Sequence, residues 1–169
     1  MRDADARLDG EVVAVLDLDL LHVARRHAED MGLDIDYRHM SAEDLAAEGA
    51  RFDIVLALEI IEHVADRSLF LGSCGELVAP GGMLVVATLN RTLKAWALAI
   101  VGAEYVLGWL PRGTHDWNKF VRPHEIARGL RPSGLKLAEV SGVTYVPFSG
   151  EWRLSRDTDV NYMALALKE

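Results

Sequence analysis

Several features are missing from this sequence, and each absence narrows the class of protein. A single cysteine among 169 residues excludes an internal disulfide and fits a reducing compartment. Neither a Gly-x-Gly-x-x-Gly motif nor a Gly-Lys-Ser phosphate loop occurs, which weakens an interpretation as an NAD-dependent oxidoreductase. The chain has 18 Lys and Arg but 26 Asp and Glu, which gives a net charge of −8. This negative charge argues against a protein that binds the phosphate backbone of nucleic acids.

What the sequence contains fits one ordinary domain. Half of the residues are hydrophobic, and the length matches a single domain over 1–169 at roughly 150 residues per domain. The opening residues 1–5 (MRDAD) are too polar and acidic for a signal or transit peptide, so we expect a cytoplasmic protein.

Apolar runs alternate with helical stripes along the first half of the chain. The runs 11–16, 52–58 and 83–88 are typical of buried strands, with a helix over 66–78 between the last two. This alternation predicts an α/β fold with a parallel sheet that helices cover on both faces. Further on, 135–146 and 160–167 predict antiparallel strands, and we expect a loop over 153–159 between them.

Acidic residues follow the predicted strands, at the edge where α/β sheets bind ligands. Asp17 ends the first strand, where a carboxylate can accept two hydrogen bonds from a ribose. Strand ends also carry Asp as a helix cap, and Asp19 is close enough to compete for the role.

A second group comprises Glu59, Glu62 and His63. If a helix starts at the end of strand 52–58, their spacing places all three on one face. Two carboxylates and an imidazole suit a divalent cation with open positions for substrate oxygens. The alternative is a solvated helix start, where Glu favours the positive end of the helix dipole.

The segment 93–110 is apolar and rich in tryptophan, but shorter than the roughly 20 residues of a spanning helix. A buried helix is the default interpretation, and an interfacial segment is the alternative. Four other polar residues lie near a strand end or in a loop that could close over it, so they are candidates for the site: Asn90, His115, Asp116 and Lys119. Surface or capping roles are the alternative for each of them. Cys74 fits packing within a helix better than a nucleophile.

Six strings carry a family resemblance: 52–55 (FDIV), 58–64 (LEIIEHV), 80–82 (PGG), 88–92 (TLNRT), 113–120 (GTHDWNKF) and 156–163 (RDTDVNYM). With them, the chain resembles the ubiquinone-biosynthesis O-methyltransferases of the class I S-adenosylmethionine-dependent methyltransferase family from about residue 11 onward. The last two strings resemble this family in particular, whereas general methyltransferases share the strings within 52–64 and at 80–82.

The resemblance implies a Rossmann-like sheet and O-methylation of catechol-like polyprenyl intermediates with S-adenosyl-L-methionine as donor. Asp17 then matches the ribose-binding acid and Leu58 a residue beside the adenosyl group. Glu59, Glu62 and His63 match a cation-binding string, with Mg²⁺ expected. The segment 93–110, part of an insertion over 93–120, matches a region that contacts the membrane, which implies peripheral association.

Methyl transfer is an in-line displacement, so alignment of the phenolic oxygen, methyl carbon and sulfonium sulfur is worth up to ~7–11 kcal/mol. A cation on the catechol oxygens would lower the phenol pKa. His63 is the alternative base in a metal-free reaction, because its ordinary pKa lies near neutral pH.

The chain departs from the family at its N-terminus. The family begins with a strand, a Gly-rich loop and a helix that have no counterpart here, so we expect an N-terminally truncated sheet. Strands 11–16 and 52–58 would then lack a shared neighbour, and the isolated chain would bind the cofactor poorly. Two hypotheses follow: a methyltransferase recorded without its N-terminus, or a non-catalytic methyltransferase-like protein that binds a partner or a membrane surface.

Overall fold

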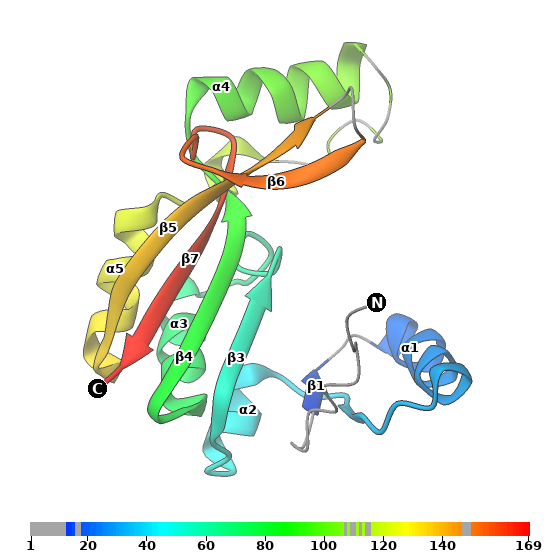
Figure 1. The fold of residues 1–169 in the computed structure, drawn as a ribbon, viewed down its shortest axis with the longest axis vertical. Helices are drawn as coiled ribbons and strands as arrows, with labels where there is room; N and C mark the ends of the chain where they lie inside the picture. The colour runs from blue at the N-terminus through cyan, green and yellow to red at the C-terminus, as the bar shows by residue number, and fades with distance from the viewer. Residues whose placement is uncertain are drawn as a thin grey trace, which may run out of the picture.

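The computed structural model describes residues 13–15, 18–106, 108, 111, 113, 116–146 and 150–169. Its strands form two sheets (Figure 1). The smaller one pairs β1 (Val13–Val15) in parallel with β2 (Asp36–Arg38). The larger one has the order β3-β4-β7-β5-β6. Its strands are β3 (Phe52–Leu58), β4 (Val78–Leu89), β5 (Leu135–Val146), β6 (Glu151–Ser155) and β7 (Asn161–Lys168).

Only the β3–β4 pair of the larger sheet is parallel; β7 runs antiparallel to both β4 and β5, and β6 antiparallel to β5. The α/β class and the antiparallel C-terminal strands are therefore confirmed. The loop predicted over 153–159 is wrong in its first part, because residues 151–155 form β6. This short strand follows a turn and pairs with the far end of β5, where Trp152 lies opposite Tyr145.

Several of the helices begin where a short polar side chain accepts hydrogen bonds from free backbone N–H groups. Ser41 caps α2, and Asp66 caps α3 by accepting from the N–H groups of Ser68 and Leu69 at 2.9 and 3.0 Å. The helices are α1 (Leu18–Met31), α2 (Ala42–Ala47), α3 (Arg67–Leu77), α4 (Leu93–Ala95), the π-helix η1 (Trp96–Val106), the 3₁₀ turns η2 (Trp117–Lys119) and η3 (Arg131–Ser133), and α5 (Pro123–Leu130). None of the helices in the described part of the chain is long and apolar enough to traverse a lipid bilayer.

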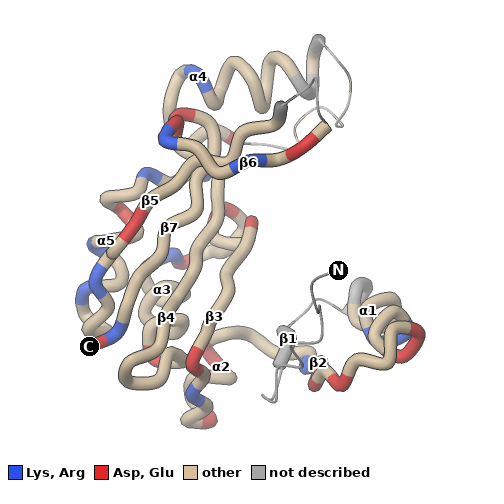
Figure 2. The backbone as a smooth tube through the Cα atoms, viewed as in Figure 1, with Lys and Arg blue, Asp and Glu red and all other residues tan. Residues whose placement is uncertain are grey.

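The core lies between the sheet and the helices α3 and α5, which sit behind it in Figure 1. Figure 2 shows that β4 and the middle of β7 carry no charge, as expected for strands at the centre of a sheet. Fully buried side chains from four elements meet there: Leu84, Val86, Ile126, Leu130, Tyr162 and Cys74. Burial raises the pKa of the Cys74 thiol to about 12, which confirms a packing role for this side chain.

The opposite face of β3 is open, which differs from the prediction of helices on both faces. Ile54, Leu56 and Leu58 alternate along this face with exposed fractions of 56, 59 and 43%. The strands β1 and β3 lie in separate sheets, as expected for two strands without a shared neighbour. In Figure 1, β1, β2 and α1 lie beside the larger sheet rather than on it.

Strand β7 ties the sheet to both helices of the core. The Tyr162 hydroxyl, buried, donates to the backbone oxygen of Val121 at 2.9 Å, just before α5. At the other end of the strand, Lys168 Nζ donates to the carbonyl oxygens of Gly75 and Val78 at 2.7 and 2.8 Å. These carbonyls lie in the last turn of α3 and at the residue that follows it, where a cation is favourable.

The close approach of β5 to the β6–β7 loop requires a glycine. A Cβ atom on Gly142 would lie 1.7 Å from the carbonyl oxygen of Asp157, a backbone atom that no rotamer change can move.

We therefore expect Gly142→Ala to destabilise the protein by ~1–3 kcal/mol, because strand and loop must separate. Gly72→Ala is the matched control, since its Cβ would meet nothing within 4 Å. Inside a helix that control should stabilise by up to ~1 kcal/mol. Urea unfolding followed by circular dichroism measures both, and equal effects of the two substitutions would contradict the packing argument.

Candidate functional site

The candidate site lies where β3 and β4 end. Leu58 is the last residue of β3, and Glu59 follows with a φ of +54°, in the left-handed region that side chains rarely adopt. The Glu59 N–H still donates to the carbonyl oxygen of Ala87 at 2.9 Å, so the chain turns sharply while paired to β4. Strained backbone of this kind costs ~1–3 kcal/mol and is concentrated at functional sites.

Glu62 points back into this corner and is 6% exposed. Its carboxylate accepts a hydrogen bond from the Thr88 hydroxyl at 2.9 Å, which joins the turn after β3 to the end of β4. Residues 61–63 form a turn, so the condition of a helix directly after the strand is not met, whereas the helix predicted over 66–78 is confirmed by α3, which begins at Arg67. The left-handed Glu59 prevents helical continuation directly from the strand.

The carboxyl group of Glu59 lies beside that of Glu62. Burial, and then the charge and hydrogen bond of Glu62, raise the pKa of Glu59 from its usual value of 4.5 to about 7. Glu59 therefore keeps its proton to a higher pH than an ordinary carboxyl group, because two adjacent carboxylates resist joint ionisation.

His63 does not join this pair. Its backbone N–H donates to the Ile60 carbonyl oxygen at 2.8 Å, and its side chain is exposed. Among the residues that the structure describes, no three His, Cys, Asp or Glu side chains are grouped as metal ligands. The three-ligand group of Glu59, Glu62 and His63 is thus not assembled, because a turn replaces the helix on which they would share a face. The remaining carboxylate pair still fits Mg²⁺, which proteins hold through one or two carboxylates.

His63 instead borders a shallow hollow of about 630 Å³ together with Arg67 and Lys119. Lys119 ends η2, and Arg67 Nη2 donates to its carbonyl oxygen at 2.8 Å, which holds η2 against the start of α3. The prediction that Lys119 lies near the strand ends is consistent with this position.

The other polar candidates have structural roles or lie outside the described part of the chain. Asn90 is 8% exposed, and its side-chain amide donates to the Thr158 carbonyl oxygen at 2.8 Å. Asp116 caps η2 through the N–H of Asn118, which matches the capping alternative. Asp17 and His115 are outside the described residues.

Thr88 is the site residue that sequence reasoning missed. It is fully buried at the end of an otherwise apolar strand, and a hydroxyl in that position needs a partner. Its position as the polar residue nearest the end of the apolar run 83–88 was the signal that could have identified it as a site residue.

The exposed side chains at this edge suit a flat, largely apolar ligand. Leu58 and Ile60 are 43 and 41% exposed, on either side of Glu59. Apolar contacts with one anchoring acid at the carboxyl end of a strand are what an adenosyl group requires.

Comparison of the sequence with known proteins agrees with this geometry. A family model described as a methyltransferase domain matches residues 4–86. The chain is 59% identical, over 86% of its length, to the ubiquinone biosynthesis O-methyltransferase of Parvibaculum lavamentivorans, of which it covers 58%. It is 54% identical, over 96% of its length, to the enzyme of the same name from Chelativorans sp., of which it covers 65%. The chain thus spans about three fifths of the length of these curated relatives.

Solved structures show the same fold at low sequence identity. Magnesium protoporphyrin IX methyltransferase from Synechocystis PCC 6803 with bound SAH superimposes with a TM-score of 0.65 at 15% identity, covering 95% of this chain and 65% of that one. A SAM-dependent methyltransferase from Methanosarcina mazei gives a TM-score of 0.64 at 14% identity, covering 94% of this chain and 82% of that one. By sequence the chain resembles the ubiquinone biosynthesis O-methyltransferases over most of its own length, and its fold is that of the class I S-adenosylmethionine-dependent methyltransferases.

Proposed function

We propose that this chain takes part in S-adenosylmethionine-dependent O-methylation of a catechol-like polyprenyl quinol in ubiquinone biosynthesis. The observation that carries the proposal is the Glu59–Glu62 carboxyl pair at the carboxyl end of β3, in a chain that resembles O-methyltransferases of that pathway. Methylation of a phenol needs a group that removes a proton, and this pair can accept one near neutral pH.

In this proposal Asp17 accepts hydrogen bonds from the ribose hydroxyls of the cofactor, and Leu58 packs against its adenosyl group. The exposed fraction of Leu58 supports its part, since an adenosyl group would cover apolar surface that is otherwise in water. The cofactor supplies an activated methyl group when bound.

Glu59 is the proposed proton acceptor. A base works best when its pKa is close to the working pH, and the pKa of about 7 meets that condition. Glu62 is fixed by the Thr88 hydroxyl and lies beside Glu59, where its negative charge contributes to the raised pKa of Glu59. His63 is the second candidate base, since it lies four residues further along the same turn and is exposed.

Peripheral membrane contact through 93–110 also belongs to this proposal. Exposed apolar side chains on α4 and η1 support it: Leu93, Trp96, Leu98 and Tyr105. Tryptophan and tyrosine favour the boundary between water and lipid.

A methyl-transfer assay tests the function. The chain should transfer a methyl group from millimolar S-adenosylmethionine to a catechol with a short prenyl group, detected by mass spectrometry. Glu59→Gln should lower kcat/KM by ~10²–10⁴-fold, the usual contribution of a general base. Glu76→Gln, at an exposed acid on α3, is the control.

A larger loss of kcat/KM in His63→Gln than in Glu59→Gln would assign the base to His63. Cofactor binding without methyl transfer would favour the alternative of a non-catalytic methyltransferase-like protein. Such a protein could bind a partner through the open face of β3.

The raised pKa of Glu59 predicts a dependence of stability on pH. The folded protein holds this proton more tightly than the unfolded chain, so the contribution is complete below pH 4.5 and is lost as the pH rises toward 7. Urea midpoints at pH 5 and pH 8 should therefore differ less in Glu59→Gln than in the unsubstituted protein. An identical difference in both proteins would contradict the raised pKa.

Binding of a divalent cation to Glu59 and Glu62 is the last part of the proposal. Mg²⁺ and the shared proton compete for the same oxygens, so calorimetric titration should show tighter binding at pH 8 than at pH 6. Glu62→Gln should abolish the heat of binding, whereas His63→Gln should leave it unchanged. Equal binding in Glu62→Gln and the unsubstituted protein would exclude this pair as the ligands.

A further inference from the structure

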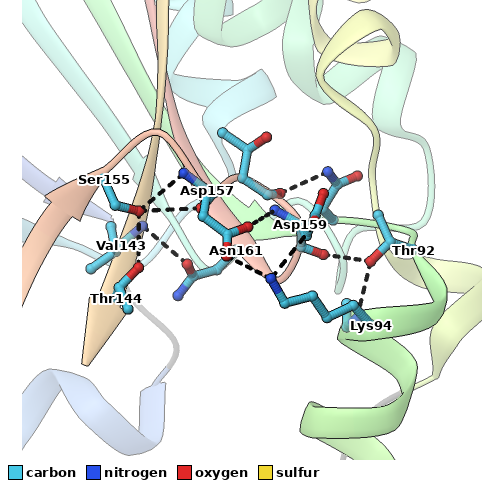
Figure 3. Close-up of polar contacts among 11 residues, drawn as sticks. Thr92, Lys94, Val143, Thr144, Ser155, Asp157, Asp159 and Asn161 are labelled. Atoms are coloured by element: carbon cyan, nitrogen blue, oxygen red, sulfur yellow. Dashed lines mark hydrogen bonds and ion pairs between the residues drawn. The ribbon is translucent and has the colours of Figure 1, made fainter. Parts of the chain in front are cut away.

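The start of the apolar helix is held by a polar cluster that the proposed reaction does not use (Figure 3). Residues 90–95, which follow β4, meet the loop 156–160, which joins β6 to β7. These two segments are more than 60 residues apart in the sequence. Side chains and backbone atoms of both take part, as Figure 3 shows.

Lys94 is the charged centre of this cluster. Its Nζ lies 2.5 Å from Asp157 Oδ2 and 3.5 Å from Asp159 Oδ2. The hydrogen bond with Asp157 raises the pKa of Lys94 and lowers that of Asp157, so both remain charged over the physiological range. One ammonium between two carboxylates is a network rather than a single pair, the arrangement in which exposed ion pairs contribute measurably.

The loop that carries the two acids is itself fixed. The Asp159 N–H donates to Asp157 Oδ1 at 3.0 Å, and the Asp157 N–H donates to Ser155 Oγ at 3.2 Å. The side-chain amide of Asn90 holds the Thr158 carbonyl oxygen from the β4 side. The carbonyl of Asp157 lies against Gly142, as described above. Lys94 therefore binds to a preorganised acceptor.

Thr92 makes the second connection at the same place. Its hydroxyl accepts from the Ala95 N–H at 3.0 Å, which caps α4, and also donates to the Asp159 carbonyl oxygen. Its own carbonyl oxygen accepts from Trp117 Nε1 at 3.1 Å, so η2 is joined to the same point. The first turn of the helix is thereby attached to two other segments.

Beyond this first turn, η1 continues from α4 as one helix. Its exposed apolar side chains, together with Leu93 at 79% exposure, project from a helix that is held at its base. A change at Lys94 therefore acts at the point from which the rest of the helix continues.

We propose that Lys94, held between Asp157 and Asp159, is a positioning residue that sets the direction of η1 at the carboxyl end of β4. In the enzyme this position presents the apolar side chains of η1 to the isoprenoid tail of the substrate; this second part rests on the proposed function. Lys94 touches neither the reacting oxygen nor the cofactor in this scheme. Its loss affects recognition of the tail and leaves methyl transfer to a tail-free catechol unchanged.

Amide hydrogen exchange of the 169-residue chain tests the positioning without any substrate. Lys94→Met keeps the length of the side chain but removes its charge, and should speed exchange in 93–106 by about three- to fivefold. Lys94→Arg should restore the slow exchange. Lys136→Met is the matched control, because it removes another exposed lysine whose Nζ lies 2.6 Å from a carboxylate, that of Glu169, away from the helix. Unchanged exchange in Lys94→Met, or the same change in Lys136→Met, would overturn the proposal.

Methyl-transfer kinetics then test the role in recognition. Lys94→Met should raise KM about three- to fivefold for a catechol with a prenyl tail and leave KM for a tail-free catechol and both kcat values unchanged. Equal changes in KM for both substrates would contradict a role in tail recognition. A Lys94→Met protein that changes only in its binding to phospholipid vesicles, with both KM values unaltered, would contradict it as well. If the unsubstituted chain transfers no methyl group, the exchange result still decides the positioning role, so the two proposals fail separately.

Discussion

The buried carboxylate of Glu62 is the constraint around which this site is organised. A carboxylate that is removed from water needs hydrogen bonds or a proton, because its desolvation is otherwise very costly. The Thr88 hydroxyl supplies one hydrogen bond, and the neighbouring Glu59 carboxyl has a raised pKa, which reduces the repulsion between the two acids. The left-handed backbone at Glu59 brings the two acids together, and in return their contact stabilises a backbone conformation that is unfavourable in isolation.

The end of β4 is the point from which the rest of the site is built. Within five residues it provides three different contacts: Thr88 to the turn after β3, Asn90 to the β6–β7 loop, and Thr92 to that loop and to η2. A strand in the interior of a sheet is among the least mobile elements of a domain, so groups anchored to it keep their relative positions. Chemistry at the carboxyl pair and the direction of the apolar helix therefore share one rigid support.

Much of this architecture follows from local sequence patterns. The uninterrupted apolar runs at 52–58 and 83–88 predict strands, and Asp66 marks the start of α3, because these signals depend on nearest neighbours alone. The turn at 59–63 could not be predicted in the same way, since Glu59 adopts a conformation that its residue type disfavours and that only tertiary contacts support. The spacing of Glu59, Glu62 and His63 was informative only if a helix was present. Strand β6 was missed because its five residues are stabilised by pairing with β5, a contact that the segment's own composition does not reveal.

The place of β7 in the sheet has a consequence for how the chain acquires its structure during synthesis. Residues 161–168 follow both β4 and β5 in the sequence but lie between them, so one edge of each of those strands stays unpaired until this segment has left the ribosome. Until then the growing chain exposes the edges to which β7 later pairs, residues 83–89 of β4 and 135–141 of β5. Long-range pairing of this kind is slow to form, so these two edges remain accessible to chaperones until β7 has been synthesised.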